Sequence, residues 1–565
     1  MLRRKLLSVL VLYAFLMPTF AQTSAPAAAT TKNYAAPADV IDRIKNEGLK
    51  NSQVMQTLSY LTDVIGARLT GSPAMKRANA WTRDQMQKWG MQNAHLEAWG
   101  PFGRGWTLKN FDAQITAPYD IPLIAYPKAW SPSTKGAITA DVVYLDAKTD
   151  ADFDKYKGQL KDKIVLVSEP RELKVDFESP MGARYKDEEL TKMANAPDPA
   201  TVQRPQQQQQ PSPQQTRRRE RFIMGLKTLN FLAQEGAAVM VDNSGNGSGG
   251  TIFVAQASVA QEVPKNIQDF FNSKRLQPWQ KEAEAKMIPQ MTLATEHYNR
   301  LVRMIQQGER LKMTVNIEAA YNDDDPMAYN TVAEIPGTDP ALKDEIVMLG
   351  GHMDSWHAGT GATDYGAGVA VAMEAARIIQ SLGLKPRRTI RVALWSGEEE
   401  GLFGSSNYVA QHFGEMKGGG SAMAAMIGGE QAKPELVKGA DYEKLSAYYN
   451  LDNGTGKIRG VYLQGNALVA PIFRQWLEPF KDLGATTLTL SNTGGTDHQS
   501  FDRIGLPGFQ FIQDEIEYDA RTHHSNQDVF DRIQADDMKQ AATILAAFLY
   551  QTAMMDEKLP RKQMK

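Results

Sequence analysis

Apolar residues at helical spacing mark the first part of the chain. They recur at intervals of three and four over residues 39–66, which predicts amphipathic helix, and the same spacing predicts a second helix over 73–89. From about residue 117 the pattern changes to short β-rich runs separated by turns, such as 142–145 and 163–167. The change predicts a separate β-rich module after the first helices.

This module contains one segment of a different composition. Residues 194–219 carry a run of five glutamines, five prolines and three consecutive arginines, and few apolar side chains. Such a composition cannot bury enough apolar surface to order itself, so we expect a solvated loop rather than a basic docking tail. The module then resumes with a predicted helix over 221–234 and a buried strand over 236–241, and it closes near 288–292.

From residue 330 onward, predicted strands and helices alternate as they do in layered α/β proteins. The strands are largely apolar, which is expected when helices cover both faces of a sheet. The fold class is therefore predicted to be α/β, with a mixed sheet flanked by helices. The predicted strands are 345–350, 389–395, 447–452 and 507–513, and the predicted helices are 367–382, 468–483 and 535–554.

The N-terminus has the parts of a secretory signal. A basic start precedes a mostly apolar run over 6–20, and small residues precede the expected cleavage after Ala21. The run contains a proline and is shorter than the roughly 20 residues that span a bilayer, which disfavours a retained anchor. We therefore expect a signal peptide over 1–21, a spacer over 22–36, an exported protein, and no membrane span after cleavage.

Composition narrows the chemistry. The 63 lysines and arginines nearly balance the 65 aspartates and glutamates, so charge gives no reason to expect a nucleic-acid or membrane partner. The chain has no cysteine, which excludes disulfides, thiol nucleophiles and cysteine-ligated zinc. A metal would have to be held by histidines and carboxylates.

Acids and imidazoles follow the ends of several predicted strands, where open α/β sheets place their ligands. Taken singly, each has an ordinary explanation, such as a helix cap for an aspartate or a solvated run for adjacent glutamates. Their joint placement favours a zinc site. The residues concerned are His352 and Asp354, Asp364 in a glycine-rich turn, Glu398 to Glu400, Asp452, and the pair His523 and His524.

Spacing suggests roles within this set. Asp354 stands two residues after His352, so its carboxylate can accept a hydrogen bond from the far imidazole nitrogen and orient the ring. Glu398 and Glu399 are adjacent and cannot point the same way. One of them can therefore bind metal while the other faces a metal-bound water.

Six short motifs contain these residues or lie in the same part of the chain. They are GGHMDSW at 350–356, GATD at 361–364, WSGEEEGL at 395–402, NLD at 450–452, GTD at 495–497 and HHSNQD at 523–528. Together they resemble the co-catalytic zinc aminopeptidase and carboxypeptidase family, and within it the plasma glutamate carboxypeptidase-like group. The resemblance covers 330–554 well and the helices before 117 more loosely. It implies a peptidase domain made of 37–117 and 291–555, an inserted protease-associated domain over 118–290, and a tail over 556–565.

The resemblance also implies site roles. Asp364 would bridge two Zn²⁺ ions, Glu398 would be the general base, and Asp354 would orient His352. Several family members place a tyrosine before the last ligand histidine, where this chain has His523, so the group that stabilises the oxyanion is open between His523 and Tyr518. One zinc ion would also bind His352 and Asp452, and the other Glu399 and His524.

The predicted function is hydrolysis of short peptides or dipeptides by a two-zinc exopeptidase, with a bridging hydroxide as nucleophile. The alternatives are a one-zinc glutaminyl cyclase and a non-catalytic binding protein on the same fold. No serine-hydrolase elbow and no HExxH helix is present. Arg459, Arg521 and Asp497 are candidates for reading a peptide terminus, so amino or carboxyl specificity stays open, as does a homodimer.

Overall fold

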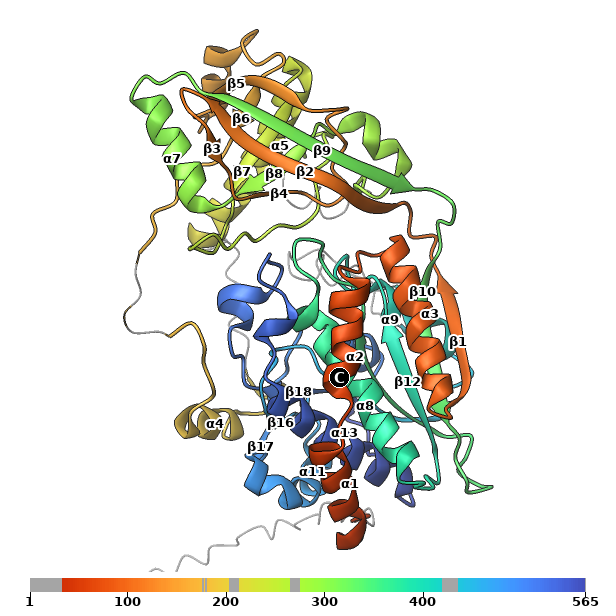
Figure 1. Ribbon diagram of the computed structural model, residues 1–565. Helices are drawn as coiled ribbons and strands as arrows, with labels where there is room; N and C mark the ends of the chain where they lie inside the picture. Colours follow the sequence, from red (N-terminus) through yellow and green to blue (C-terminus); the bar gives the residue numbers. More distant parts are fainter. Residues whose placement is uncertain are drawn as a thin grey trace, which may run out of the picture.

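The computed structural model describes residues 33–174, 177, 180–202, 213–264, 275–418 and 435–563. It has two lobes, each built on an eight-stranded sheet, with the second lobe above the first in Figure 1. The predicted signal peptide, most of the spacer and the glutamine run lie outside the described residues.

The lower lobe has a mixed sheet whose strand order is β1-β10-β12-β11-β15-β18-β16-β17. Its centre is parallel, because β11 pairs in parallel with both β12 and β15, and β15 pairs in parallel with β18. Parallel strands bring their carboxyl ends to one edge. The strands are β1 (Gln92–Trp99), β10 (Ala328–Ile335), β11 (Ile346–His352), β12 (Thr389–Trp395), β15 (Leu445–Asn450), β16 (Ile458–Tyr462), β17 (Thr487–Thr489) and β18 (Gly508–Gln513).

Helices cover both faces of this sheet. The larger core packs one face of β11, β12 and β15 against α8 and α13, while α9 and α12 cover the other face. This two-sided cover explains why the central strands are largely apolar. The helices are α1 (Ala38–Lys50), α2 (Val54–Ser59), α3 (Pro73–Lys88), α8 (Ala367–Ser381), α9 (Phe403–His412), α11 (Ala470–Leu477), α12 (His498–Asp502) and α13 (Ala535–Met554).

The upper lobe has the strand order β3-β2-β9-β5-β6-β7-β8-β4, with β5, β6, β7 and β8 parallel to one another. Helices α5 (Pro213–Glu235) and α7 (Thr295–Gln306) lie in this part of the chain. The strands are β2 (Gly105–Ala117), β3 (Ile121–Pro122), β4 (Ala125–Pro127), β5 (Ile138–Tyr144), β6 (Ile164–Leu166), β7 (Val239–Asn243), β8 (Gln290–Leu293) and β9 (Lys312–Asn322).

Smaller elements complete the structure. Helix α4 (Asp187–Ala194) lies beside β17 of the lower lobe, although its neighbours in sequence belong to the upper lobe (Figure 1). A hairpin joins β13 (Gly414–Lys417) to β14 (Glu435–Lys438). Short 3-10 or π turns occupy Tyr60–Ile65, Asp150–Tyr156, Lys281–Lys286, Ala362–Gly366, Ala467–Val469, Glu478–Leu483, Tyr518–Thr522 and Phe530–Arg532.

The predicted fold class is confirmed, and the predicted strand 389–395 and helix 535–554 have the observed bounds. Two helices differ from expectation. The helical pattern over 39–66 is interrupted between α1 and α2. The helix predicted over 468–483 is α-helical only to Leu477, and Pro479 follows in a 3-10 turn because proline cannot donate the next helical hydrogen bond.

The loop predicted over 194–219 was wrong at its C-terminal end, because α5 already begins at Pro213 and continues through the arginine triplet. Proline is favoured in the first turn of a helix, so Pro213 is itself a signal for a helix start. The upper sheet also extends beyond the range 118–290 predicted for the inserted domain, because β2 and β9 pair along their length outside it. The rest of the domain division stays a prediction.

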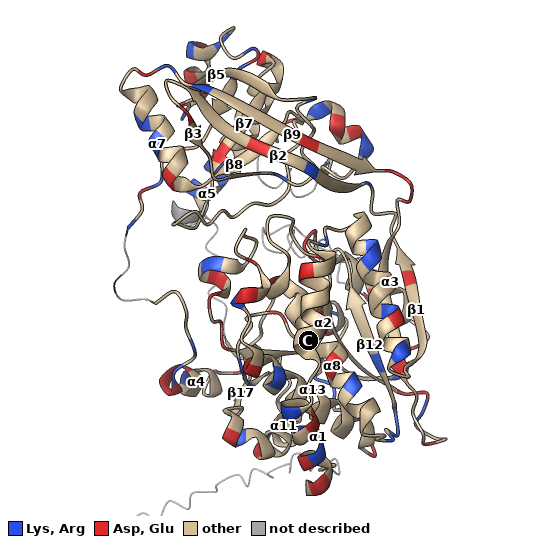
Figure 2. Ribbon diagram, viewed as in Figure 1, with Lys and Arg blue, Asp and Glu red and all other residues tan. Residues whose placement is uncertain are grey.

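Charged residues of both signs are interspersed over both lobes (Figure 2), in keeping with a formal net charge of −2. Among the helices that the structure describes, none combines the length and the hydropathy of a membrane span.

Candidate metal centre

The central parallel strands deliver the first candidate ligands. His352 is the last residue of β11, and Glu398 and Glu399 lie in the turn after the neighbouring strand β12. Asp452 follows β15, the parallel neighbour of β11 on its other side. Parallel pairing therefore brings these residues to one edge, as the sequence predicts.

Asp364 reaches this edge from a glycine-rich turn that Arg68 holds in place. The buried Arg68 guanidinium donates to the carbonyl of Met353 at 2.7 Å, to that of Thr360 at 2.8 Å and to that of Gly361 at 2.6 Å. Gly361 has φ +65, and a Cβ there would lie 2.7 Å from the guanidinium, so glycine permits this approach. Arg68 thus fixes the loops after His352 and before Asp364.

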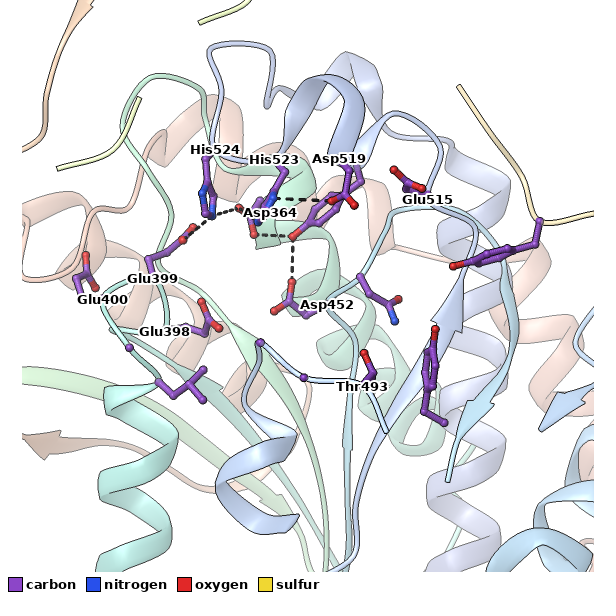
Figure 3. Close-up of a pocket in the computed structure, with 18 residues that line it drawn as sticks. Asp364, Glu398, Glu399, Glu400, Asp452, Thr493, Glu515, Asp519, His523 and His524 are labelled. Atoms are coloured by element: carbon purple, nitrogen blue, oxygen red, sulfur yellow. Dashed lines mark hydrogen bonds and ion pairs between the residues drawn. The ribbon is translucent and has the colours of Figure 1, made fainter. Parts of the chain in front are cut away.

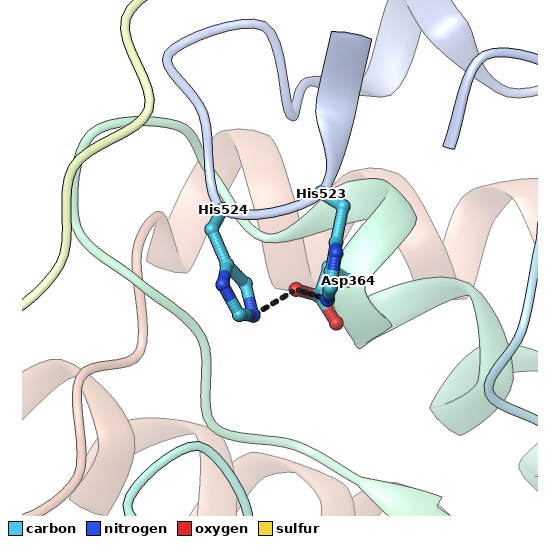
Figure 4. A group of neighbouring side chains, drawn as sticks. All are labelled: Asp364, His523 and His524. Atoms are coloured by element: carbon cyan, nitrogen blue, oxygen red, sulfur yellow. Dashed lines mark ion pairs between the residues drawn. The ribbon is translucent and has the colours of Figure 1, made fainter. Parts of the chain in front are cut away.

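The loop after β18 contributes the two adjacent histidines. His524 Nε2 lies 3.0 Å from Glu399 Oε2 and 3.3 Å from Asp364 Oδ2, and His523 Nε2 lies 3.7 Å from the same Asp364 oxygen. Figure 4 shows both imidazoles directed at Asp364. His524 has φ +62, which is unusual for a residue with a side chain.

On the other side of Asp364, His352 Nε2 lies 3.5 Å from Asp364 Oδ1 and 3.6 Å from Asp452 Oδ2. Glu398 also belongs to this side, because it offers an oxygen within 4.8 Å of ligand atoms of His352 and Asp452. Asp364 therefore stands between two groups of ligand-type atoms. Figure 3 shows Glu399 directed at His524, and Glu398 lying apart from it toward Asp452.

These atoms meet the requirements of zinc. Two ligands bound tetrahedrally at 2.0–2.1 Å lie about 3.3 Å apart. Leaving His523 aside, the four pairs given above are separated by 3.0–3.6 Å. His352 Nε2, Asp364 Oδ2 and Glu399 Oε1 are buried without a hydrogen-bond partner. Orphaned polar atoms are costly in an interior, and a cation would satisfy them. The donor set of imidazoles and carboxylates fits zinc.

The electrostatics of the site agree with this fit. Burial, together with the neighbouring carboxylates, raises the pKa of Glu398 and the pKa of Glu399 well above the usual value. Burial opposes the charged form of His352, but Asp452 and Glu398 hold its pKa well above the usual range. The site thus concentrates negative charge in a buried place, and cations would relieve that repulsion.

Asp354 is placed as an orienting residue, but in a different way from the one expected. His352 Nδ1 lies 3.1 Å from the backbone carbonyl of Asp354 and 3.7 Å from its carboxylate. The backbone therefore accepts the imidazole proton at hydrogen-bond distance. The Asp354 carboxylate instead accepts from Thr70 Oγ1 and from the Glu399 backbone N–H, both at 3.2 Å, and so links the loops of two strands.

Of the two candidates for the oxyanion, Tyr518 is engaged within the site. Its hydroxyl lies 2.9 Å from Asp364 Oδ1 and 3.2 Å from Asp452 Oδ1. Burial and these two carboxylates raise its pKa well above the usual value, so the hydroxyl keeps its proton. His523 stacks on the Tyr518 ring and is 39% exposed in its side chain, so it is the more accessible of the two.

The three residues considered for reading a peptide terminus are not brought to the cavity. Asp497 is wholly buried, and burial raises its pKa to about 7. Arg459 donates to Asp514 and to the carbonyl of Tyr185, and Arg521 contacts Glu517 and Met181. The described residues that line the cavity include none of these three.

The candidate ligands open into a cavity of about 620 Å³, within the size range of small-ligand sites. Tyr185, Tyr462, Thr493 and Glu515 also line it. A second hollow of about 530 Å³ adjoins it and shares Asp519, His523 and His524. Its remaining wall comes from the upper lobe, through Asn246 and Phe253 to Ala255.

Sequence reasoning missed two positioning residues. Arg68 carries no motif signal, because its partners are carbonyls about 285 to 293 residues away. Asp528 accepts from the Thr363 backbone N–H and hydroxyl, beside Asp364. Asp528 does stand in the HHSNQD run, five residues after His523, and this proximity is the one signal that points to it.

Comparisons with known proteins agree with this geometry. Residues 330–549 match the model of peptidase family M28. Carboxypeptidase Q of Mus musculus is 32% identical over 275 residues, which are 48% of this chain and 52% of the mouse protein, and the Homo sapiens protein is 30% identical over the same length. The chain thus spans about half the length of the curated relatives it matches.

Solved structures show the same fold. A peptidase M28 precursor from Shewanella amazonensis SB2B superposes with a TM-score of 0.61 at 22% identity, covering 93% of this chain and 99% of the other. A zinc aminopeptidase from Bacillus subtilis superposes with a TM-score of 0.50 at 17% identity, covering 90% and 96%. The sequence match, the fold and the sheet-edge site agree, and residues 330–549 of this chain are similar to peptidase family M28.

Proposed function

We propose that this protein is a two-zinc exopeptidase that hydrolyses short peptides or dipeptides. The observation that carries the proposal is the position of Asp364 between two groups of buried ligand-type atoms at zinc-like separations. The names of two similar proteins, a carboxypeptidase and a zinc aminopeptidase, support it. On sequence pattern alone, we also propose that residues 1–21 direct export.

In this proposal Asp364 binds both ions. His352 and Asp452 complete one set, because both lie on the β11 and β15 side of Asp364. Glu399 and His524 complete the other set, where their side chains are 3.0 Å apart. Bound zinc would supply Lewis acidity for a peptide carbonyl and a water of lowered pKa.

Glu398 is the proposed general base. It lies at the cavity wall beside the ligands, and burial with the neighbouring carboxylates raises its pKa, so it accepts a proton more readily than an exposed glutamate does. It takes the proton of the attacking water and returns it to the leaving amine. His523 donates to the developing oxyanion, since Tyr518 is already held by two carboxylates.

The lining of the cavity favours a free amino terminus. Among its described lining residues there is no lysine or arginine that would pair with a terminal carboxylate. Glu515 and Asp519 line it beyond the proposed ligands and base, and either offers a negative charge to an ammonium group. The proposed direction of cleavage is therefore from the amino end.

A panel of blocked dipeptides tests the proposal. We expect an unblocked dipeptide and its C-terminal amide to be hydrolysed, an N-acetylated dipeptide to be resistant, and all activity to be lost with a chelator and restored by zinc. The measurement is product formation by amine release and chromatography. Hydrolysis of the N-acetylated peptide alone would reverse the assigned direction, and no chelator-sensitive hydrolysis of any peptide would remove the exopeptidase function.

A second prediction concerns the upper lobe and zinc affinity. Asn526 accepts from the Ile252 backbone N–H at 2.8 Å and donates to the Gly250 carbonyl at 3.2 Å. The Val254 N–H donates to the His524 carbonyl at 3.2 Å. The upper lobe therefore holds the loop in which His524 has its positive φ.

We expect Asn526→Ala to weaken zinc binding by roughly 10- to 100-fold, as loss of a residue that orients a ligand does. Competition with a chromogenic chelator measures the zinc Kd directly, independently of activity. Asn230→Ala is the matched control, because Asn230 makes a single hydrogen bond within the upper lobe, to the Gln261 carbonyl. Equal zinc affinity in the two variants would contradict the positioning role.

A further inference from the structure

One segment of the upper lobe's sequence lies on the lower lobe. Residues 180–202, called the strap below, come between β6 and α5 of the upper sheet. The strap contains α4, which packs beside β17 of the lower lobe (Figure 1). No described residue of the strap belongs to the two apolar clusters around the parallel strands of the upper lobe, so we turn to its contacts on the lower lobe.

Arg184 anchors the strap through buried charges. Its guanidinium lies 2.9 Å from Asp514 and 2.7 Å from Asp537, and the side chains of these acids are 0% and 3% exposed. Arg459 makes a further pair with Asp514 at 3.0 Å. Removing one member of a buried ion-pair network leaves an uncompensated charge, so we expect Arg184 to be needed to hold the strap in this position.

Backbone contacts then fix the residue next to Arg184. Ala183 and Ile516 exchange two backbone hydrogen bonds of 2.8 and 2.9 Å. The Tyr185 N–H donates to Asp514 at 2.9 Å, and the Tyr185 carbonyl accepts from Arg459 at 3.1 Å. Tyr185 is therefore held on both sides of its Cα, which sets the direction of its side chain.

That side chain enters the substrate cavity. Tyr185 lines it together with Tyr462, the last residue of β16, and each tyrosine influences the pKa of the other. Of the neighbouring acids, Glu515 raises the pKa of Tyr185 the most. In Figure 3, Glu515 lies on the side of the cavity opposite Glu399.

We propose that the tyrosine pair is the end wall of the substrate cavity and limits the enzyme to the first residue of a peptide. This inference rests on the proposed exopeptidase function and deepens it. The rest of the peptide leads past the imidazoles into the second hollow, which the upper lobe lines with Phe253, Val254 and Ala255. The substrate class is short peptides with a free amino terminus, whose first side chain contacts the two phenol rings.

The products released from a tetrapeptide test whether the tyrosine pair closes the end of the cavity. With an unblocked tetrapeptide, the wild-type protein is expected to release single residues in sequence. In Tyr185→Ala the cavity is open at its end, so cleavage at the second bond should rise relative to the first by roughly tenfold, the effect of removing one good packing contact. Mass spectrometry of early products gives this ratio without requiring equal activity of the variants.

Matched variants separate the wall from a general disturbance. Tyr185→Phe keeps the ring and should keep the wild-type product ratio. Arg184→Ala should change the ratio as Tyr185→Ala does, and the double variant should add nothing, because both act through one side chain. Tyr119→Ala removes a half-exposed tyrosine of the upper lobe and should leave the ratio unchanged.

The outcomes are distinguishable. If wild-type protein cleaves the tetrapeptide in a chelator-sensitive way and Tyr185→Ala gives the same products in the same ratio, the wall is overturned and the exopeptidase function stands. If wild-type protein cleaves no peptide, the function itself fails. A changed ratio in Tyr119→Ala as well would also overturn the wall, because the effect would not be specific to the cavity.

Discussion

Replacement of Glu398 by glutamine should lower kcat by roughly 10²- to 10⁴-fold, the range that a general base contributes, while zinc content stays at the wild-type value. Glutamine keeps the size of the side chain but cannot accept the proton of the attacking water. The zinc content should persist because the proposed ligand sets do not need Glu398. Steady-state kinetics with an unblocked dipeptide, together with elemental analysis of the same preparation, measures both quantities.

Glu318→Gln is the matched control, since Glu318 is an exposed residue of β9 in the upper lobe. It should retain wild-type kcat. Two results would count against the assigned base. Full turnover in Glu398→Gln would remove Glu398 from that role, and loss of one zinc ion would make Glu398 a ligand, in line with its position near His352 and Asp452.

The second large effect is expected at Asp364. Asp364→Asn should lower the zinc stoichiometry from two to one or none and reduce kcat/KM by roughly 10³-fold, because several kcal/mol of charge stabilisation depend on the metal pair. The asparagine keeps the volume of the side chain but cannot bridge two cations as a carboxylate does. Its effect on zinc is measured by elemental analysis after gel filtration.

Asp354→Asn provides a graded comparison. Among the described residues, the Asp354 carboxylate contacts Thr70, the Glu399 backbone and the His352 ring, so its loss should weaken zinc binding by about 10- to 100-fold without changing the stoichiometry at saturating zinc. Wild-type protein that binds one zinc ion, with Asp364→Asn unchanged, would instead favour the one-metal cyclase alternative.

The central sheet was predictable because its strands are short, largely apolar runs bounded by turns. The run over 389–395 is one of them, and it forms β12 with those bounds. The acids and imidazoles after such strands converge for a general reason, the common edge of parallel strands. That is why the candidate ligands could be named before any distance was known.

Residues whose partners are distant in sequence could not be predicted in this way. Arg184 pairs with Asp514, which lies 330 positions later in the sequence, and no local pattern predicts that pairing. Asp354 illustrates a finer limit. Its spacing from His352 predicts an orienting contact, but whether the carbonyl or the carboxylate accepts the imidazole proton depends on loop geometry that the sequence does not encode locally.

The buried Arg68 has a consequence for the order of events during synthesis. Its guanidinium belongs to the first seventy residues, yet the carbonyls that it must bind are made nearly three hundred residues later. In the folded protein, burial lowers its pKa only to about 10, so the guanidinium stays cationic at neutral pH. The N-terminal helices can therefore complete their packing only after the β11 loop has been made, and His524 joins the site later still.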